Sequence, residues 1–305
     1  MSTHYFRFAA RRLEDSPRCA PLERLLARSA GSTAVLDWRT DAFRVIAPQA
    51  QVMPGLGAVA LHAAGGVLPG AWVWFATPVH YVAETNNVRM AADGILSLTA
   101  DEAKTLASDF NRVWRGAGIR LRAIDSGRLF VVLDESLPGT SKDPEEVLDR
   151  PIGDYLPTGT GAAGLRRLMS EIEMWLFDHE VNRRRIAAGV APVSGLWLWG
   201  GGPMPAALPA VRGWSVGNDP FFAALCGASS ELSGTSSGVI VTADAPGTHA
   251  WQEIGGRWLP PAVEQLRSGR LSRIILSAGE RSFAVTARRS WRIWRRPRPW
   301  WEYFA

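Results

Sequence analysis

The chain has 305 residues, of which 47% are hydrophobic and 21% are charged, so it is long enough for one large or two modest globular domains. Its formal net charge is +5. The segment Thr286–Ala305 holds six Arg and one acid, Glu302, so the other 285 residues sum to zero. The basic character therefore belongs to the tail and gives no indication of a nucleic-acid surface over the whole protein, and with two cysteines we do not expect a disulfide framework.

The amino-terminal segment Met1–Leu13 is rich in Arg and has no continuous apolar run, so no signal peptide is expected and a cytoplasmic protein is predicted. The stretch Ala47–Ala83 carries no formal charge, but four prolines and two glycine pairs interrupt it. A membrane span needs about 20 mostly apolar residues in an unbroken helix. We therefore expect buried strands and turns in this stretch, and no membrane as a partner.

The first part of the chain predicts a short helix at Leu22–Ala30 and an apolar run at Ala71–Ala76, which Pro78 is expected to end. The segment Val79–Leu133 then has the pattern of a small α+β unit with the order β-β-α-β-β. Thr99 and Glu102 form a capping box that begins its helix. The four strands are expected at Val79–Val82, Val88–Leu96, Ile119–Ala123 and Arg128–Leu133.

The stretch Ser136–Thr160 is rich in Pro, Gly and acidic residues and predicts a linker. One long amphipathic helix is expected from Gly161 to Gly189, with His179 on its apolar stripe. Val193–Trp199 follows without any charge, as a strand covered on both faces would. A helix followed by a buried strand favours an α/β layer. Later elements are expected at Val239–Thr242 (a buried strand), Pro260–Arg267 (a short helix), and Arg273–Ser277 with Ser282–Thr286 (a hairpin).

Two short motifs match known functional patterns in sequence, but the elements predicted around them differ from those that the patterns require. Gly159–Gly164 matches G-x-G-x-x-G, but Leu156-Pro157 precedes it where a dinucleotide-binding fold needs a strand. We therefore favour a flexible helix entry. The free N–H groups of such an entry could still hold a phosphate. Gly234–Gly238 matches G-x-S-x-G, but Ser236 has a loop before it and a strand after it, the reverse of a nucleophile elbow.

Asp244 and His249 follow the predicted strand Val239–Thr242, at the position where α/β proteins collect ligand groups. They are candidate metal ligands, but a catalytic site for a divalent metal needs at least three protein ligands. The five His include no H-x-H or H-x-x-x-H pair. No metal or other cofactor is therefore expected.

A basic group ends the expected long helix and is the main candidate for ligand binding. It consists of His179, Asn182, Arg184 and Arg185, and Gly200, Gly201 and Gly202 would let backbone approach the same anionic small molecule. The alternative is a helix end where basic groups meet the macrodipole and His179 is a hydrogen-bonded core residue.

The tail from Ser290 alternates Trp and Arg, and such residues stack on bases and neutralise phosphates. The favoured alternative is a last strand whose Trp291 and Trp294 pack on the body of the protein, followed by a solvated Arg-rich end.

Part of the chain resembles a known family, the RpfE-type regulatory proteins of proteobacteria, which are often labelled cofactor-independent phosphoglycerate mutase-like. The resemblance covers roughly Trp72–Leu208. It rests on the residues Thr77-Pro78-Val79-His80, Leu165–Trp175, His179-Glu-Val-Asn182, Gly189, Pro192-Val193 and Leu196-Trp-Leu-Trp-Gly-Gly-Gly202. The archaeal-type phosphoglycerate mutases of the alkaline-phosphatase superfamily look like more distant relatives, and this likeness implies two metals and a Ser nucleophile.

The chain departs from the mutase pattern at the positions that carry the chemistry. No Asp-Gly-x-Gly-Asp-like start is present, and Met53–Trp74, where the resemblance places the nucleophile, contains no Ser or Thr. After Ile275-Leu276, where a closing Asp-His metal pair is implied, the chain reads Ser277-Ala278-Gly279-Glu280. Phosphoryl transfer would lack both its acceptor and its electrostatic clamp.

The expected fold is α/β, a degenerate alkaline-phosphatase-like core sheet (residues 1–76 with 161–305) with an inserted β-β-α-β-β domain and linker (residues 77–160). The favoured function is that of a catalytically degenerate mutase-like protein in regulation, which binds an anionic ligand or a protein partner. The alternatives are a working phosphoglycerate mutase with a rearranged site around Asp244 and His249, and nucleic-acid binding through the tail.

Overall fold

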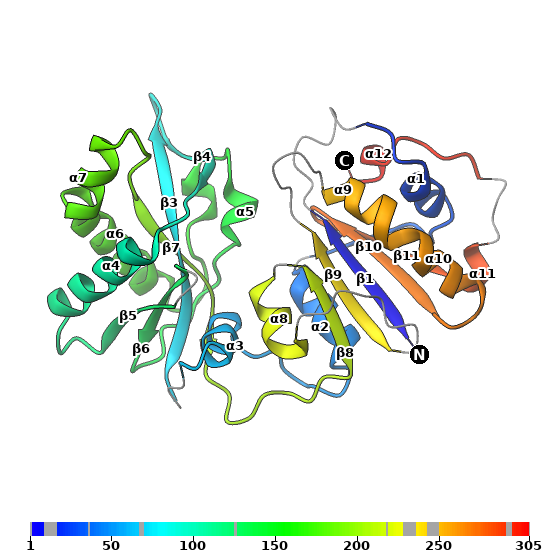
Figure 1. Ribbon diagram of the computed structural model, residues 1–305, viewed down its shortest axis with the longest axis horizontal. Helices are drawn as coiled ribbons and strands as arrows, with labels where there is room; N and C mark the ends of the chain where they lie inside the picture. The colour runs from blue at the N-terminus through cyan, green and yellow to red at the C-terminus, as the bar shows by residue number, and fades with distance from the viewer. Residues whose placement is uncertain are drawn as a thin grey trace. The chain divides into compact units, whose positions relative to one another are not determined.

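The computed structural model describes residues 2–8, 17–35, 37–66, 70–124, 127–217, 219–227, 236–242, 250–290 and 295–304. The described chain is mixed α/β and forms two compact units (Figure 1). Unit 1 combines Met1–Met53 with Pro209–Ala305, and unit 2 is the continuous segment Pro54–Leu208. No helix among the described residues is long and apolar enough to cross a membrane.

These units differ from the division expected at residues 76/77 and 160/161. The strand β3 (Trp72–Ala83) runs through residue 76 without a break, and β7 (Gly195–Pro203), which was expected in the core, pairs with it from Trp72 to Val79. Backbone hydrogen bonds thus place the apolar segment 54–76 and the helix–strand segment 161–208 in unit 2.

Unit 1 contains a six-stranded sheet with the order β2-β11-β10-β1-β9-β8. Strands β10, β1, β9 and β8 are parallel, and β11 and β2 add an antiparallel edge. The bounds are β1 Thr3–Phe8, β2 Ser32–Ala34, β8 Gly213–Gly217, β9 Ser237–Thr242, β10 Arg273–Ala278 and β11 Arg281–Thr286. The strand predicted at Val239–Thr242 is therefore present as β9, and the predicted late hairpin is present as β10 and β11.

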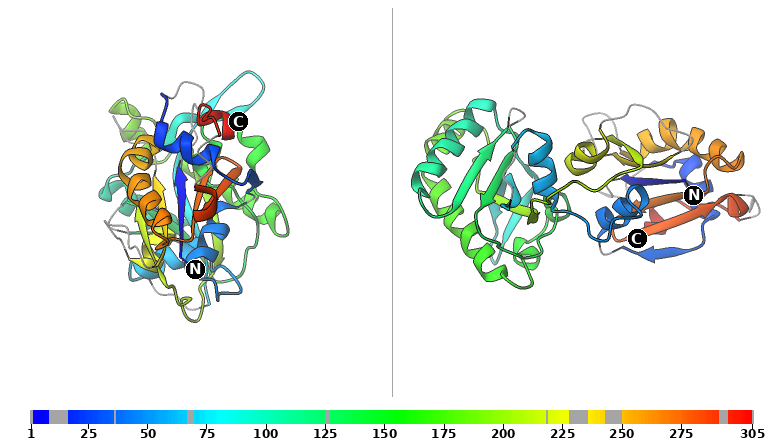
Figure 2. Two further views of the ribbon diagram at one scale, coloured as in Figure 1. Left: turned by 90° about the vertical axis from the view of Figure 1, so that its right-hand side faces the viewer. Right: turned by 90° about the horizontal axis from the view of Figure 1, so that it is seen from below.

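Helices cover both faces of the unit 1 sheet, as a parallel sheet requires (Figure 2). One face holds α1 (Ala20–Ala27) and the helical stretch of α9 (Ala250–Glu253), the π-helical turn η3 (Ile254–Trp258) and α10 (Leu259–Arg267). The other holds α2 (Trp38–Ile46) and α8 (Pro220–Cys226).

The end of the chain packs on the first of these faces. Trp300 is 1% exposed, contacts Phe8 edge-on at 5.8 Å between ring centroids, and donates its indole N–H to the Pro17 carbonyl. Phe304, on the short helix α12 (Trp301–Phe304), also packs edge-on against Phe8. Each such buried aromatic contributes roughly 1.5–3 kcal/mol. Trp291 and Trp294, which were expected to make this contact, lie outside the described residues, as part of a segment that follows α11 (Ala287–Ser290).

Unit 2 contains an antiparallel sheet with the order β4-β3-β6-β5, and β7 also pairs with β3. Strands β6 and β4 pair with different stretches of β3, at residues 72–75 and 79–83, and β7 pairs with residues 72–79. The strands β4 (Val88–Ile95), β5 (Ile119–Ala123) and β6 (Leu129–Leu133) and the helix α4 (Ala100–Val113) give the predicted β-β-α-β-β order. Both halves of the predicted capping box are formed, from Thr99 N to Glu102 at 2.8 Å and from Glu102 N to Thr99 at 3.2 Å.

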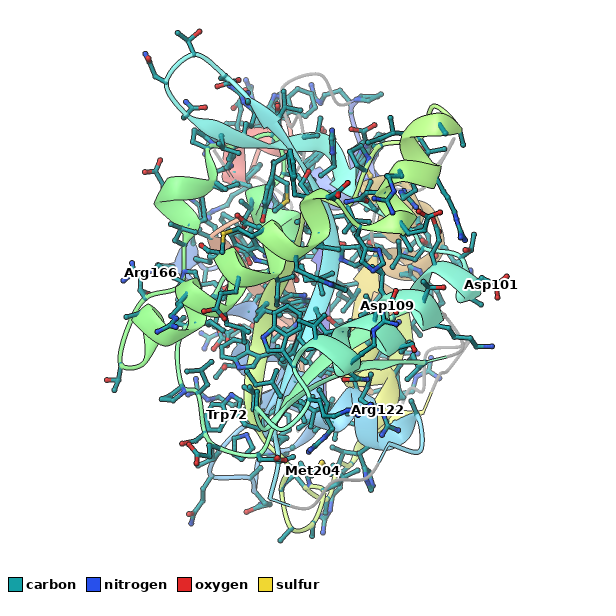
Figure 3. The ribbon with its side chains drawn as sticks, turned by 90° about the vertical axis from the view of Figure 1, so that its left-hand side faces the viewer. Trp72, Asp101, Asp109, Arg122, Arg166 and Met204 are labelled. Atoms are coloured by element: carbon teal, nitrogen blue, oxygen red, sulfur yellow. The ribbon has the colours of Figure 1, made fainter. Side chains whose placement is uncertain are left out.

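The helices α4, α6 (Ala162–Phe177) and α7 (Glu180–Ala187) cover one face of this sheet, and α3 (Leu56–Ala63) lies on the other (Figures 1 and 2). Figure 3 looks onto the α4, α6 and α7 side, where Asp101 and Arg166 extend to solvent. The stretch expected to be a linker carries a short helix α5 (Pro144–Val147) and a 3-10 turn η2 (Ile152–Tyr155).

Two predictions about unit 2 were wrong. Pro78 does not end the strand, because its missing N–H removes only one bond of the ladder and its carbonyl still accepts from Leu96 N. The long helix expected from Gly161 to Gly189 is two helices, because the chain leaves helical geometry at His179 (ψ 144°) and starts α7 there.

The three glycines lie inside β7 and not beyond its end, and close packing explains them. A Cβ atom on Gly201 would overlap the Trp74 indole, and one on Gly202 would lie 2.6 Å from Gly55 Cα at the start of α3. Gly200 has φ +61°, a conformation that L side chains rarely adopt. The glycine run thus lets β7 approach α3 and Trp74.

We expect Gly201→Ala to lower the free energy of unfolding by about 1–3 kcal/mol, because Trp74 or β7 must move to admit the methyl group. The measurement is the midpoint of urea unfolding followed by tryptophan fluorescence. Gly153→Ala is the matched control, since no atom lies within 4 Å of its Cβ position. Equal midpoints for the two variants would contradict the packing explanation.

Candidate functional site

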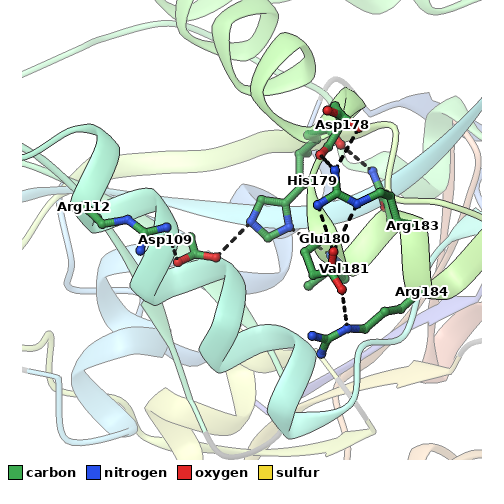
Figure 4. A network of polar contacts seen from close by, with 10 residues as sticks. Asp109, Arg112, Asp178, His179, Glu180, Val181, Arg183 and Arg184 are labelled. Atoms are coloured by element: carbon green, nitrogen blue, oxygen red, sulfur yellow. Dashed lines mark hydrogen bonds and ion pairs between the residues drawn. The ribbon is translucent and has the colours of Figure 1, made fainter.

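His179 begins α7 as its N-cap residue and is only 8% exposed. Its Nδ1 accepts a hydrogen bond from Val181 N at 3.2 Å, and its Nε2 lies 3.3 Å from Asp109 Oδ2 on α4 (Figure 4). Both contacts suit the neutral ring with its proton on Nε2. Burial lowers the pKa of His179, and Asp109 opposes this by raising it. The ring therefore connects α7 to α4, as the hydrogen-bonded core alternative expected.

Asn182 is 3% exposed and ties α7 to the start of β7. Its Nδ2 donates to Leu176 O at 2.7 Å and to Val193 O at 2.8 Å, and its Oδ1 accepts from Val193 N at 2.8 Å. These bonds satisfy backbone groups that α6 and the α7–β7 loop leave open. Asn182 is therefore occupied inside the protein.

The two candidate arginines lie in different surroundings. Arg185 is 7% exposed, donates to Ala191 O at 2.8 Å and pairs with Glu102 of the capping box at 2.8 Å. Hydrogen bonds from the Thr99 backbone and from Arg185 lower the pKa of Glu102. Arg184 is exposed and pairs with Glu180 one turn earlier at 2.8 Å. Both guanidinium groups are thus already paired with carboxylates of the protein.

The structure does not bring the basic group and the glycines together. Asn182 bonds Val193 ahead of β7, while Gly200–Gly202 occupy the far end of that strand. Eight residues separate Val193 from Gly201, and at about 3.3 Å per strand residue this is roughly 25 Å. The anionic-ligand site expected from these seven residues is therefore not assembled, because an extended strand separates residues that lie near one another in the sequence.

The carboxyl edge of the parallel strands in unit 1 is where an α/β sheet usually collects ligand groups. Arg7 donates to Ser277 Oγ at 3.2 Å and to Gly279 O at 2.8 Å there. Nearby, Arg39 pairs with Asp219 at 2.9 Å, and both side chains are at least 90% buried. Burial raises the pKa of Tyr5 to about 12, so its phenol stays protonated at neutral pH. Among the described residues, Arg7 and Arg39 lie at this edge, and Arg39 neutralises Asp219.

A two-metal centre, which the mutase resemblance implies, does not fit the donor set that the described residues supply at this edge. Among the described residues, no three His, Cys, Asp or Glu side chains lie close enough to share a metal ion. Asp244 and His249 follow β9 in the chain and lie outside the described residues.

Two cavities offer space for a ligand. The larger, about 970 Å³ in unit 2, is bounded by the end of α4, β5, the end of β6 and α6. Four of its charged residues form two ion pairs, Arg120 with Asp134 and Arg167 with Glu171. The smaller, about 420 Å³ in unit 1, is lined by four arginines and one acid. Three of these arginines belong to the Arg-rich tail identified from the sequence. The fourth, Arg281, comes from β11, and only the fold brings it beside the tail.

Comparisons with known proteins point to one class of enzyme. The chain is 34% identical over 119 residues to a 2,3-bisphosphoglycerate-independent phosphoglycerate mutase of Methanothrix thermoacetophila, a match that covers 37% of this chain and 30% of the relative. It is 29% identical over 110 residues to 2,3-bisphosphoglycerate-independent phosphoglycerate mutase 2 of Methanothermobacter thermautotrophicus, covering 35% and 27%. The matches thus span about a third of the length of these curated relatives.

No family model matches the chain. Among solved structures, a cofactor-independent phosphoglycerate mutase from Thermoplasma acidophilum aligns over 93% of this chain and 89% of its own, with 17% identity and a TM-score of 0.40. The chain is therefore similar in sequence, over about a third of its length, to cofactor-independent phosphoglycerate mutases.

Asn182→Ala should lower the free energy of unfolding by about 2–4 kcal/mol, because it leaves buried backbone groups at Leu176 and Val193 without partners. Arg184→Ala removes the ion pair with Glu180, but it should change the free energy of unfolding by less than about 0.5 kcal/mol, because that pair is exposed. Chemical unfolding of both variants measures this. A larger loss for Arg184→Ala than for Asn182→Ala would contradict the assignment.

The lowered pKa of His179 gives a pH dependence with a defined sign. The unfolded chain binds the proton near the ordinary value of 6.5 and the folded chain only at lower pH, so stability falls as the pH drops below about 6.5 and through the folded pKa. His179→Asn keeps an N-cap acceptor but does not titrate. We expect unfolding free energies between pH 7 and pH 5 to fall more steeply for the wild type than for this variant, and parallel curves would refute the linkage.

Proposed function

We propose that this protein is a catalytically degenerate phosphoglycerate-mutase-like protein that acts by binding, in a regulatory role, an anionic small molecule or a protein partner. The sequence similarity to cofactor-independent phosphoglycerate mutases supports the mutase-like scaffold. The finer assignment to RpfE-type regulatory proteins rests on the motifs between Trp72 and Leu208. The proposed loss of catalysis rests on the segment Met53–Trp74 and on the charges at the carboxyl edge of the unit 1 sheet.

The segment ahead of the β-β-α-β-β unit carries this proposal. The resemblance places the nucleophile in Met53–Trp74, which has no Ser or Thr. Here the segment contains α3, and the start of this helix packs on two strands. Its N-cap Gly55 faces Gly202 of β7, and Gly57 faces the backbone of Trp74 and Phe75 in β3. A side chain added at either glycine would collide with backbone. The position therefore offers neither a hydroxyl for phosphoryl transfer nor space for one at these glycines.

The charges at the carboxyl edge of the unit 1 sheet also favour binding over metal-assisted transfer. Phosphoryl transfer in a two-metal site needs carboxylate and imidazole ligands that clamp both reacting oxygens. Arg7 and Arg39 occupy this edge, and Arg39 neutralises Asp219. Guanidinium groups can hold an anion but cannot coordinate a cation.

A second candidate function is a working mutase with a rearranged site. The similarity to mutases fits it equally, and Asp244 and His249 follow β9, which lies beside β1 in the sheet. On this alternative, the two side chains would be essential for turnover.

The deciding experiment is a coupled phosphoglycerate mutase assay on the full chain with added Mn²⁺ or Mg²⁺, with metal analysis of the purified protein and the variants Asp244→Ala and His249→Ala. We expect no turnover above background in any sample and no stoichiometric metal. Turnover in the wild type that either variant abolishes would replace this proposal with the rearranged mutase. A fluorescence melting curve of each variant provides the folding control.

A further inference from the structure

We infer that the small cavity of unit 1 is a binding site for a compound that carries two phosphoryl groups. The cavity lies between the end of α1, the strands β2 and β11, and the tail, and it measures about 420 Å³. Arg281 of β11 and the tail residues Arg295, Arg296 and Arg298 line it, with Glu302 as the one acid. This inference names the anionic ligand that the proposed function leaves open, and it rests on that function only for its regulatory meaning.

The four arginines line the cavity as exposed side chains, and Glu302 is the one acid beside them among the described residues. None of them has an ion-pair partner among the described residues, although unit 1 pairs other arginines, such as Arg18 with Glu23. Arg295 donates to the Ser29 carbonyl at 3.4 Å, and Arg298 lies over the Tyr303 ring at 5.2 Å. Four guanidinium groups against one carboxylate leave a formal charge of +3 around the cavity (4 − 1). Like charges gathered in this way repel one another, and a bound anion removes that cost.

The charge and the lining together define the ligand class. A phosphoryl group carries about −1.5 to −2 at neutral pH, so two of them balance the surplus. Guanidinium forks match phosphate oxygens in bidentate geometry. The volume is near the lower end of ligand cavities, which run from about 300 to 1,000 Å³.

The aromatic lining argues against a nucleobase. Phe283 is 4% exposed and faces the core, and one face of Tyr303 is already covered by the Arg298 guanidinium. Single-stranded nucleic acids bind such grooves by stacking bases on free aromatic faces. A small phosphorylated compound therefore suits the cavity better than the nucleic acid that the tail composition suggested.

The test is isothermal titration calorimetry of the full chain with inorganic pyrophosphate as the probe, at fixed ionic strength. We expect saturable binding to one site that weakens as salt is raised. Arg281→Ala and Arg296→Ala should each weaken binding about tenfold, as the loss of a charged hydrogen bond does. Arg184→Ala is the matched control, because it removes an exposed arginine from unit 2, and it should change the affinity by less than about twofold.

Three results would overturn the inference. They are the absence of saturable binding, an equal loss in Arg184→Ala and Arg281→Ala, and tighter binding of a single-stranded oligonucleotide than of pyrophosphate that Arg281→Ala also weakens. Since calorimetry reads binding alone, mutase turnover with an intact pyrophosphate site would contradict the proposed function and leave this inference standing.

Discussion

The close approach of β7 to Trp74 and to the start of α3 is the constraint on which unit 2 depends. Glycine at residues 200–202 permits this approach, because a Cβ atom at Gly201 or Gly202 would overlap an indole ring or a facing backbone. The approach lets β7 pair along β3, which makes β3 the central strand of the sheet. At the other end of β7, Asn182 bonds Val193 and fixes where the strand begins. The segment that most resembles a ligand site is thus fixed at both ends by packing and hydrogen bonds.

The basic residues beside this segment extend the same framework. His179 joins α7 to α4 through Asp109, and Arg185 joins α7 to the capping box of α4 through Glu102. Each contact places a polar group from α7 against a partner on α4, in the layer that covers one face of the sheet, and Figure 4 shows the one between His179 and Asp109. A mutase-like scaffold can therefore keep these residues for stability without any reaction that uses them.

The sequence predicted what depends on neighbouring residues. The β-β-α-β-β order, the capping box and the late hairpin follow from alternation, turn residues and the Thr99–Glu102 pair, all of them local. The break at His179 was missed because no Gly or Pro interrupts the segment between Leu165 and Ala188, and only the contacts with Asp109 and Val181 reveal a new helix start. The unit boundary was missed because strand pairing across more than a hundred residues leaves no local pattern.

The same distinction separates the binding residues predicted from the sequence from those that the structure leads us to propose. Arg184 and Gly200–Gly202 are near one another in the chain but are separated by the length of a strand, whereas Arg281 and Arg296 are distant in the chain and line one cavity. Hydrogen–deuterium exchange of the full chain with and without pyrophosphate tests this account most directly. Slower exchange in peptides covering residues 26–32 and 281–304, with no change in residues 179–205, is the predicted result. Protection confined to residues 179–205 would contradict the account.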